Sequence, residues 1–371
     1  MPETRDQLEP PVAGPDRRDP ADARPAGDDR DAGPAVRRRP GAQAVGAGLV
    51  VAGAALMIYG AVTGAIIVPA RVIVFLAGLV CLASGLGRVT RAVFGPRFDM
   101  VLWLCVGWLV LLVVAAALAP VLPLAEHLDL AATLAEPVNA TPALLSGHPL
   151  GTNNFGLDLL ARSVYGARTS LVVALSAVVI GAVVGGAIGI VAGYFRRGVD
   201  SVVGVLTNSL LAVPPLILLI ALSTVLDPSV VTMAVSLSLL TIPSMVRLAR
   251  ANTIAFAQRE FVLVARAIGA SRLRVMVREL LPNVLLPMLS MAVVLISVLI
   301  VAEASLSFLG LGFDPPHPSW GNMIAEGQGG EFEKHPHLVV VPGVFLFLTV
   351  FSFNLLGEKA QKRWDPRGEK L

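Results

Sequence analysis

The chain carries eight apolar stretches, each about long enough to cross a lipid bilayer as a helix. The hydrocarbon core of a bilayer is about 30 Å thick, and an α-helix spans it with about 20 mostly apolar residues. Because lipid offers no hydrogen-bond partner to an open backbone, helices are the only reasonable structure for such stretches. The sequence therefore predicts an all-α membrane protein of about eight transmembrane helices, at about 44–67, 72–87, 100–124, 169–194, 202–226, 229–247, 284–303 and 338–357.

The composition supports this class of protein. Of the 371 residues, 55% are hydrophobic and 15% are charged, whereas globular domains carry about 25% charged residues. This balance excludes a water-soluble enzyme and a collagen-like chain. Cys81 and Cys105 lie inside apolar runs without C-x-x-C spacing, so we predict small buried hydrophobes and neither a disulfide scaffold nor a metal site.

Residues 1–43 are of a different kind, rich in Pro, Asp, Arg, Ala and Gly. The first 41 residues hold eight arginines against nine acidic residues, and such a segment cannot bury enough apolar surface to fold. We therefore predict a disordered, charged cytoplasmic tail. Because its acids outnumber its bases, no nucleic-acid partner is expected, although the whole chain has a net charge of +3.

The basic residues are distributed asymmetrically about the apolar stretches. With the N-terminus in the cytoplasm and eight crossings, 25 of the 29 Lys and Arg residues fall on the cytoplasmic side. Cytoplasmic loops of membrane proteins carry such an excess. The sequence thus predicts a multi-pass cell-membrane protein with both termini in the cytoplasm and four basic residues outside, Arg71, Arg162, Arg168 and Lys334.

Two of the predicted spans contain unusual residues. Pro214 and Pro215 lie in mid-span and should kink or break their helix. Since a broken helix at membrane depth often lines a cavity, these prolines and Asn208 are candidate pathway residues, although Asn208 could equally satisfy carbonyls that the break frees. Four glycines on one helix face have a spacing that lets two helix backbones approach closely; they are Gly181, Gly185, Gly189 and Gly193.

Motifs for enzymatic chemistry are missing. The sequence contains no G-x-x-x-x-G-K-[ST] loop, no H-E-x-x-H and no G-x-S-x-G turn. We predict no catalytic residue, no metal site and no cofactor, and a conduit or an anchor in place of an enzyme. The histidines fall in or beside outside loops and are predicted to be solvated; they are His127, His148, His317, His335 and His337.

The longest cytoplasmic segment between spans, residues 248–283, is predicted to form a short helix–turn–helix. Gly269 can end the first helix in a left-handed conformation, Ser271 can cap the second, and Pro282 marks the start of the next span. This segment needs either a partner protein or the lipid headgroups to cover its apolar residues. Helical spacing puts them on one face of each helix, as Phe261, Val264, Ala265 and Ile268 and as Leu273, Val277, Leu280 and Leu281.

The stretch from Phe261 to Asn283 resembles the cytoplasmic signature loop of ABC-importer permeases, in which a coupling helix docks into a cleft of the ATPase. Ala265 and Gly269 match that loop, whereas Leu263 and Val264 replace a Glu-Ala pair. Three further stretches resemble the dipeptide, oligopeptide and nickel permease family, in the order of the second of its two permease partners. They are HPLGTNNFGLDLLARSVYGARTSL (148–171), EASLSFLGLGFDPPHPSWGNMIAEG (303–327) and HPHLVVVPGVFLFLTVFSFNLLGEKAQKRWDPR (335–367).

The resemblance implies a six-helix permease domain over residues 100–368. Members of the family usually have six spans, so residues 44–99, with two extra spans and a cytoplasmic linker, are an addition. The implied parts of the domain are a first span (100–124), an external loop (125–168), the remaining spans (169–357) and the coupling loop (248–283).

The resemblance also implies the partners, namely a second permease subunit, two ABC ATPase subunits, an extracytoplasmic solute-binding protein and the lipid bilayer. Di- or oligopeptides are the expected cargo, with nickel or another small solute as the alternative. A secondary transporter and a membrane scaffold are more distant alternatives. The residues assigned to ATPase coupling are Ala265, Arg266, Gly269, Ala270, Ser271 and Pro282.

Two further predictions concern the outside face. Glu303 follows an apolar run, where an acid is expensive, so it either lines the pathway or pairs with the other permease, or else lies just past the interface and is solvated. Residues 304–336 are acidic overall, and Asp314, Trp320 and Glu326 are predicted to form a docking surface for the binding protein.

Overall fold

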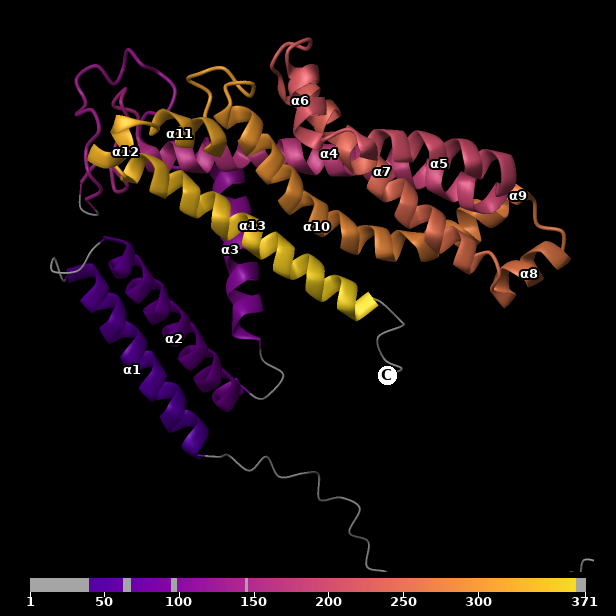
Figure 1. The fold of residues 1–371 in the computed structure, drawn as a ribbon, viewed down its shortest axis with the longest axis horizontal. Coiled ribbons are helices and arrows are strands. Elements are labelled where there is room, and N and C mark those ends of the chain that lie inside the picture. The colour runs from indigo at the N-terminus through magenta and orange to yellow at the C-terminus, as the bar shows by residue number, and fades with distance from the viewer. Residues whose placement is uncertain (1–39, 63–67, 95–98, 144–145, 365–371) are drawn as a thin grey trace, which may run out of the picture. The chain divides into compact units, whose positions relative to one another are not determined.

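The computed structural model describes residues 40–62, 68–94, 99–143 and 146–364. These residues form α-helices joined by loops, with no strand among them (Figure 1). The chain divides into two compact units, residues 1–97 and 98–371. Most of the predicted charged tail lies outside the described residues. The prediction is wrong at the end of the tail, because helix α1 already begins at Pro40, and proline suits the first position of a helix.

The first unit contains two helices, α1 (Pro40–Val62) and α2 (Val68–Phe94). Glycines let them pack closely, since a Cβ added to Gly53 would lie 2.5 Å from the backbone nitrogen of Leu82. The predicted spans 44–67 and 72–87 fall on these helices. Within the described residues of this unit, the apolar helical segment Val45–Leu56 is shorter than the 18 residues expected of a membrane span. The count of eight spans therefore stays a prediction.

In the second unit, five described helices are long and apolar enough to cross a membrane, and a bent helix pair makes a sixth if it counts as one span. They occupy the positions of the six predicted core spans. The bent pair is α5 (Arg197–Ala212) and α6 (Pro215–Ser223), which meet at 83°. The five are α3 (Met100–Leu118), α4 (Leu159–Phe195), α7 (Val230–Phe256), α13 (His337–Trp364) and a continuous helix composed of α9 (Arg272–Arg274), the π-helical η2 (Val275–Leu280) and α10 (Leu281–Phe308).

Helices α4 and α7 lie side by side (Figure 1), and the glycine face predicted from the sequence forms their contact. A Cβ on Gly185 would lie 2.7 Å from the carbonyl oxygen of Ile242, and one on Gly189 would lie 2.6 Å from that of Val246. Gly181 and Gly193 face α7 in the same way. The prediction of close helix packing along this face is confirmed.

Several helices end at other residues than predicted. α4 begins at Leu159 inside the predicted external loop, and α7 continues to Phe256 inside the predicted coupling loop. α3 ends at Leu118, before the predicted end at 124. Hydropathy locates the apolar middle of a span, whereas helix ends depend on polar caps such as Asp158, whose side chain accepts a hydrogen bond from the amide of Ala161. The short helices α11 (Trp320–Glu326) and α12 (Gly330–Lys334) lie at the opposite end of this unit from α8 (Glu260–Ala267) and α9 (Figure 1).

Candidate functional site

The turn between α8 and α9 has the local geometry that the sequence predicts. Gly269 is in the left-handed region at φ +86°, and the amides of residues 268–270 donate to carbonyls of α8 at 3.0 Å each. The hydroxyl of Ser271 accepts from the amide of Arg274 at 3.4 Å and caps α9. Pro282 occupies the first turn of α10. The chain thus forms a helix–turn–helix whose reversal depends on Gly269.

A small apolar cluster holds this segment against the end of α4. The guanidinium of Arg266 lies 4.9 Å from the ring centre of Tyr194, and that of Arg272 lies 5.8 Å from the ring centre of Phe195. Cation–π contacts of this kind add to the apolar packing. The buried members of the cluster are Ala257, Val262, Ala265, Val275 and Leu280.

Most of the apolar residues predicted for one face of each helix are exposed, and two of them are buried. Ala265 and Leu280 are buried in the cluster, whereas Ile268 is 81% exposed and Leu273 is 68% exposed. Val264 is also exposed. The reason is that one face of α8 packs on the protein itself, and the opposite face is left uncovered. We call the exposed residues Phe261, Leu263, Val264, Ile268 and Leu273 the apolar tip.

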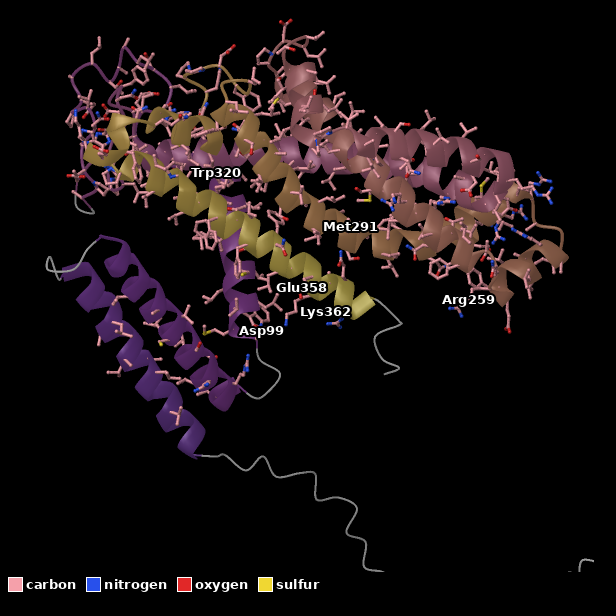
Figure 2. The ribbon with its side chains drawn as sticks, viewed as in Figure 1. Asp99, Arg259, Met291, Trp320, Glu358 and Lys362 are labelled. Carbon is pink, nitrogen blue, oxygen red and sulfur yellow. The ribbon has the colours of Figure 1, made fainter. Side chains whose placement is uncertain are left out.

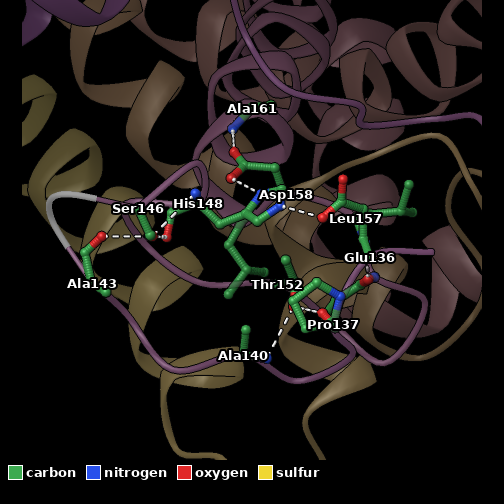
Figure 3. Close-up of polar contacts among 12 residues, drawn as sticks. Glu136, Pro137, Ala140, Ala143, Ser146, His148, Thr152, Leu157, Asp158 and Ala161 are labelled. Carbon is green, nitrogen blue, oxygen red and sulfur yellow. Dashed lines mark hydrogen bonds and ion pairs between the residues drawn. The ribbon is translucent and has the colours of Figure 1, made fainter. Parts of the chain in front are cut away.

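At the other end, the loop before α4 is organised by side chains of the 148–158 stretch (Figure 3). His148 lies between two carboxylates, with Nδ1 3.0 Å from Oδ2 of Asp158 and Nε2 3.1 Å from Oε2 of Glu136. Burial alone lowers the pKa of His148, but the two carboxylates outweigh burial and hold its pKa above the ordinary value of 6.5. Asp158 uses its other oxygen to cap α4, 2.7 Å from the amide of Ala161.

The structure corrects the predicted docking surface. Trp320 is fully buried, and its indole N–H donates to the carbonyl of Ser163 at 3.0 Å. Glu326 accepts from Arg162 at 2.5 Å and from Asn153 at 2.9 Å. These residues join α11 to α4 and to the loop before it. Figure 2 shows Trp320 well away from Arg259, which lies beside α8 at the other end.

Two of the three residues in that prediction therefore serve the fold. Asp314 is exposed, as a docking residue would have to be. Arg162, which is 1% exposed, was placed in the outside loop by the sequence, without a partner. A buried arginine requires an acid. Neither the burial of Arg162 nor the identity of its acid is indicated by the sequence.

Glu303 is fully buried in α10, and the solvated alternative is wrong. The hydroxyl of Ser170 donates to its Oε2 at 2.6 Å, and the hydroxyl of Ser307 donates to Oε1 at 2.7 Å. Ser170 belongs to α4, so the carboxyl group of Glu303 links α4 to α10. Its contacts within the subunit are those of a residue that joins two helices.

The helix break at Pro214 and Pro215 is confirmed. α5 ends at Ala212, and α6 begins at Pro215 with an 83° change of direction. Pro214, Pro215 and Asn208 are all exposed. Within the described chain, the side chain of Asn208 makes no hydrogen bond, so it does not satisfy a carbonyl that the break frees.

The histidine prediction is wrong for several residues. His337 is 8% exposed, and the side chains of His127 and His148 are 17% and 16% exposed. His127 stacks on Tyr165 with ring centres 3.6 Å apart. The loops at this end of the unit pack on the helix ends, which covers residues that look solvated in the sequence. Of the cysteines, Cys105 is buried as predicted and Cys81 is half-buried.

Residues 185–369 match the family described as "Binding-protein-dependent transport system inner membrane component". A putative peptide transport system permease protein of Brucella suis is 36% identical over 220 residues, which are 59% of this chain and 74% of that relative. The chain belongs to this permease family.

Other relatives have related names. The dipeptide transport system permease protein of Alkalihalophilus pseudofirmus is 32% identical over 256 residues, 69% of this chain and 82% of the relative. The glutathione transport system permease protein of Escherichia coli is 36% identical over 220 residues, 59% of this chain and 72% of the relative. Among solved structures, an inward-facing methionine ABC transporter is 19% identical with a TM-score of 0.43, over 56% of this chain and 96% of that one.

Family membership confirms the predicted class. The protein is an all-α, multi-pass inner-membrane permease subunit of an ABC importer. It is not itself an enzyme, because ATPase activity in such a system lies in partner subunits. The secondary-transporter and scaffold alternatives are thereby set aside. The family works with an ATPase and a binding protein at the membrane.

Proposed function

We propose that this permease subunit forms part of the pathway through which di- or oligopeptides, delivered by an extracytoplasmic binding protein, are imported. The support comes from the names of the relatives, which are permease proteins of peptide, dipeptide and glutathione transport systems. Nickel or another small solute is the alternative cargo. Uptake of a labelled dipeptide that excess unlabelled dipeptide abolishes and excess nickel leaves unchanged supports the peptide assignment, and the reverse pattern contradicts it.

We propose that the apolar tip docks on an ATPase subunit. The observation that carries this proposal is the uncovered face of α8, where Ile268 is 81% exposed although the opposite face is buried. An apolar patch that a folded protein leaves exposed is typical of an interaction surface. The cluster behind the tip would transmit its movement to α4 through Ala265 and Arg266. Gly269, Ala270, Ser271 and Pro282 shape the turn and the start of α10.

The assembly and its orientation belong to the same proposal. We infer a second permease subunit, two ATPase subunits and cytoplasmic termini, supported by the 25-to-4 distribution of basic residues. A division into a tail that ends before Pro40, two extra spans with a linker (up to 99) and a permease domain (100–368) is supported by the boundary between the two compact units. Asp314 is retained as an exposed contact for the binding protein.

We also propose that the bend between α5 and α6 lines the pathway. Pro214 and Pro215 are exposed at the bend, and Asn208, six residues before Pro214, presents an amide without a partner in the described chain. Irregular backbone at membrane depth is tolerated where it lines a cavity. Glu303 is buried between α4 and α10, so its effect on the pathway would be through the position of these helices.

The ATPase contact is tested with Ile268→Asp. Because Ile268 makes no part of the buried cluster, a charge there should leave the fold intact, abolish co-purification of the ATPase and stop uptake. Leu134→Asp is the matched control, since Leu134 is 86% exposed in the outer loop. Gly269→Pro should have the same effect as Ile268→Asp, because it removes an N–H that donates to Arg266. Normal ATPase retention and uptake in Ile268→Asp would contradict the proposal.

A further inference from the structure

A cavity of about 330 Å³ lies at the outer-loop end of α4 and α7. Its polar lining includes His127, Arg168 and His317, and its apolar wall includes Val172 of α4 and Val230 of α7. The volume is at the lower end of the 300–1,000 Å³ that is usual for small-molecule sites. It therefore suits one end of a small peptide and is too small for a long one.

The charge of the lining points to an anionic ligand. Arg168 is exposed at the cavity and makes no ion pair or hydrogen bond with its side chain in the described part of the chain. No Asp or Glu is among the lining residues. The contrast with Arg162 is informative, because that arginine is buried and paired with Glu326. The side chain of Arg168 thus does not stabilise the described fold through an ion pair or a hydrogen bond. Its planar guanidinium group can form two parallel hydrogen bonds with a carboxylate.

His127 offers a second polar group. Its Nε2 is buried and has no hydrogen-bond partner among the described residues, while its ring is held flat against Tyr165. A buried polar atom without a partner is uncommon in folded proteins. The Nδ1 of the same ring lies 3.9 Å from Oε1 of Glu126. A hydrogen bond from Nε2 to a ligand would therefore require a small movement of the ring that uncovers this atom.

The acid that precedes His127 in the chain is not among the residues that line the cavity. Glu126 precedes His127, and its Oε1 accepts from the backbone amides of residues 127, 128 and 129 at 2.9–3.0 Å. These hydrogen bonds, led by the one from Asp129, lower the pKa of Glu126 and keep it ionised. Its carboxylate is therefore committed to its own loop and does not pair with Arg168.

We propose that this cavity receives the carboxylate end of a peptide on the outside of the membrane, with Arg168 pairing with the carboxylate and His127 contributing a hydrogen bond. The proposal rests on the function and orientation proposed above. It names the part of the substrate that this subunit recognises, which the family assignment does not supply.

The test uses the complete transporter in proteoliposomes with its binding protein, and compares uptake of a dipeptide with uptake of the same dipeptide amidated at its C-terminus. The binding protein is the same in every arm, so its own preference cancels when permease variants are compared. Arg168→Gln should reduce the acid-to-amide uptake ratio by about tenfold, the usual effect of losing a charge-assisted hydrogen bond. Arg168→Lys should fall between, because it keeps the charge and loses the fork.

Lys334→Gln is the matched control, since it removes an exposed positive charge of the outer face away from the cavity, and its ratio should equal that of the wild type. An equal loss of acid and amide uptake in Arg168→Gln would overturn the proposal. Any unchanged ratio in this variant would do so as well, and weaker attachment of the binding protein beside it would assign Arg168 to the contact with that protein. Failure of the wild-type complex to take up either dipeptide would instead refute the proposed function.

Discussion

The contact between α4 and α7 allows a prediction in which the same substitution has opposite effects at two positions. Gly185→Ala would place a Cβ 2.7 Å from the carbonyl oxygen of Ile242 and 2.8 Å from the Cβ of Met245. Both neighbours are part of the rigid helix α7, so neither can swing away. Gly107→Ala, on α3, would place its Cβ in open space, with nothing within 4 Å.

The expected magnitudes follow from two terms. Replacing glycine by alanine inside a helix stabilises it by about 0.5–1 kcal/mol, and both variants gain this. Gly185→Ala also overpacks the helix contact, which costs about 1–3 kcal/mol. We therefore expect Gly107→Ala to stabilise the protein and Gly185→Ala to destabilise it. The difference between the two variants isolates the packing term, because the helix-propensity term cancels.

The measurement is the free energy of unfolding of the purified protein in a denaturing-detergent titration, made on both variants and the wild type. The two glycines lie in candidate spans, so both variants unfold from a similar micellar environment. Equal stabilisation by the two substitutions would refute the packing argument, since it would mean that α4 and α7 can separate at no cost.

Three further predictions concern buried polar groups. Glu326→Gln should destabilise the protein by about 3–5 kcal/mol in the same titration, because Arg162 keeps its charge and loses its partner. The double variant with Arg162→Met should recover part of this loss. Equal loss of stability in the single and double variants would argue against the ion pair. The pKa of His148 is raised in the folded state, so its ion pairs stabilise the loop fully below about pH 6.5 and are lost as the pH rises through the folded pKa. His148→Leu should remove this pH dependence from the unfolding temperature. An unchanged pH profile in this variant would contradict the role of the His148 ion pairs. Glu303→Leu should lower the free energy of unfolding by about 1–3 kcal/mol, because it leaves two buried hydroxyls without a hydrogen-bond acceptor. Wild-type uptake by Glu303→Gln would show that the residue has a purely structural role.

Local features of the chain were predictable from the sequence because neighbouring residues determine them. The positions of the core helices follow from about 20 apolar residues in a row. The break at Pro214 follows from the missing backbone donor of Pro215, and the reversal at Gly269 follows from its left-handed backbone. The glycine face of α4 was also readable, because a spacing of four residues puts small residues on one side of a helix.

The partners of the polar residues were decided by the tertiary structure alone. Arg162 and Glu326 are 164 positions apart, and Ser170 and Glu303 are 133 apart, so no local pattern relates them. Trp320 and Glu326 look like surface residues in an acidic loop, yet packing of α11 on α4 buries the indole and pairs the carboxylate. A charged or polar side chain indicates only that it needs water or a partner. Which of the two it receives depends on how the helices meet, and this is what placed Arg162 inside the fold and left Arg168 at the cavity.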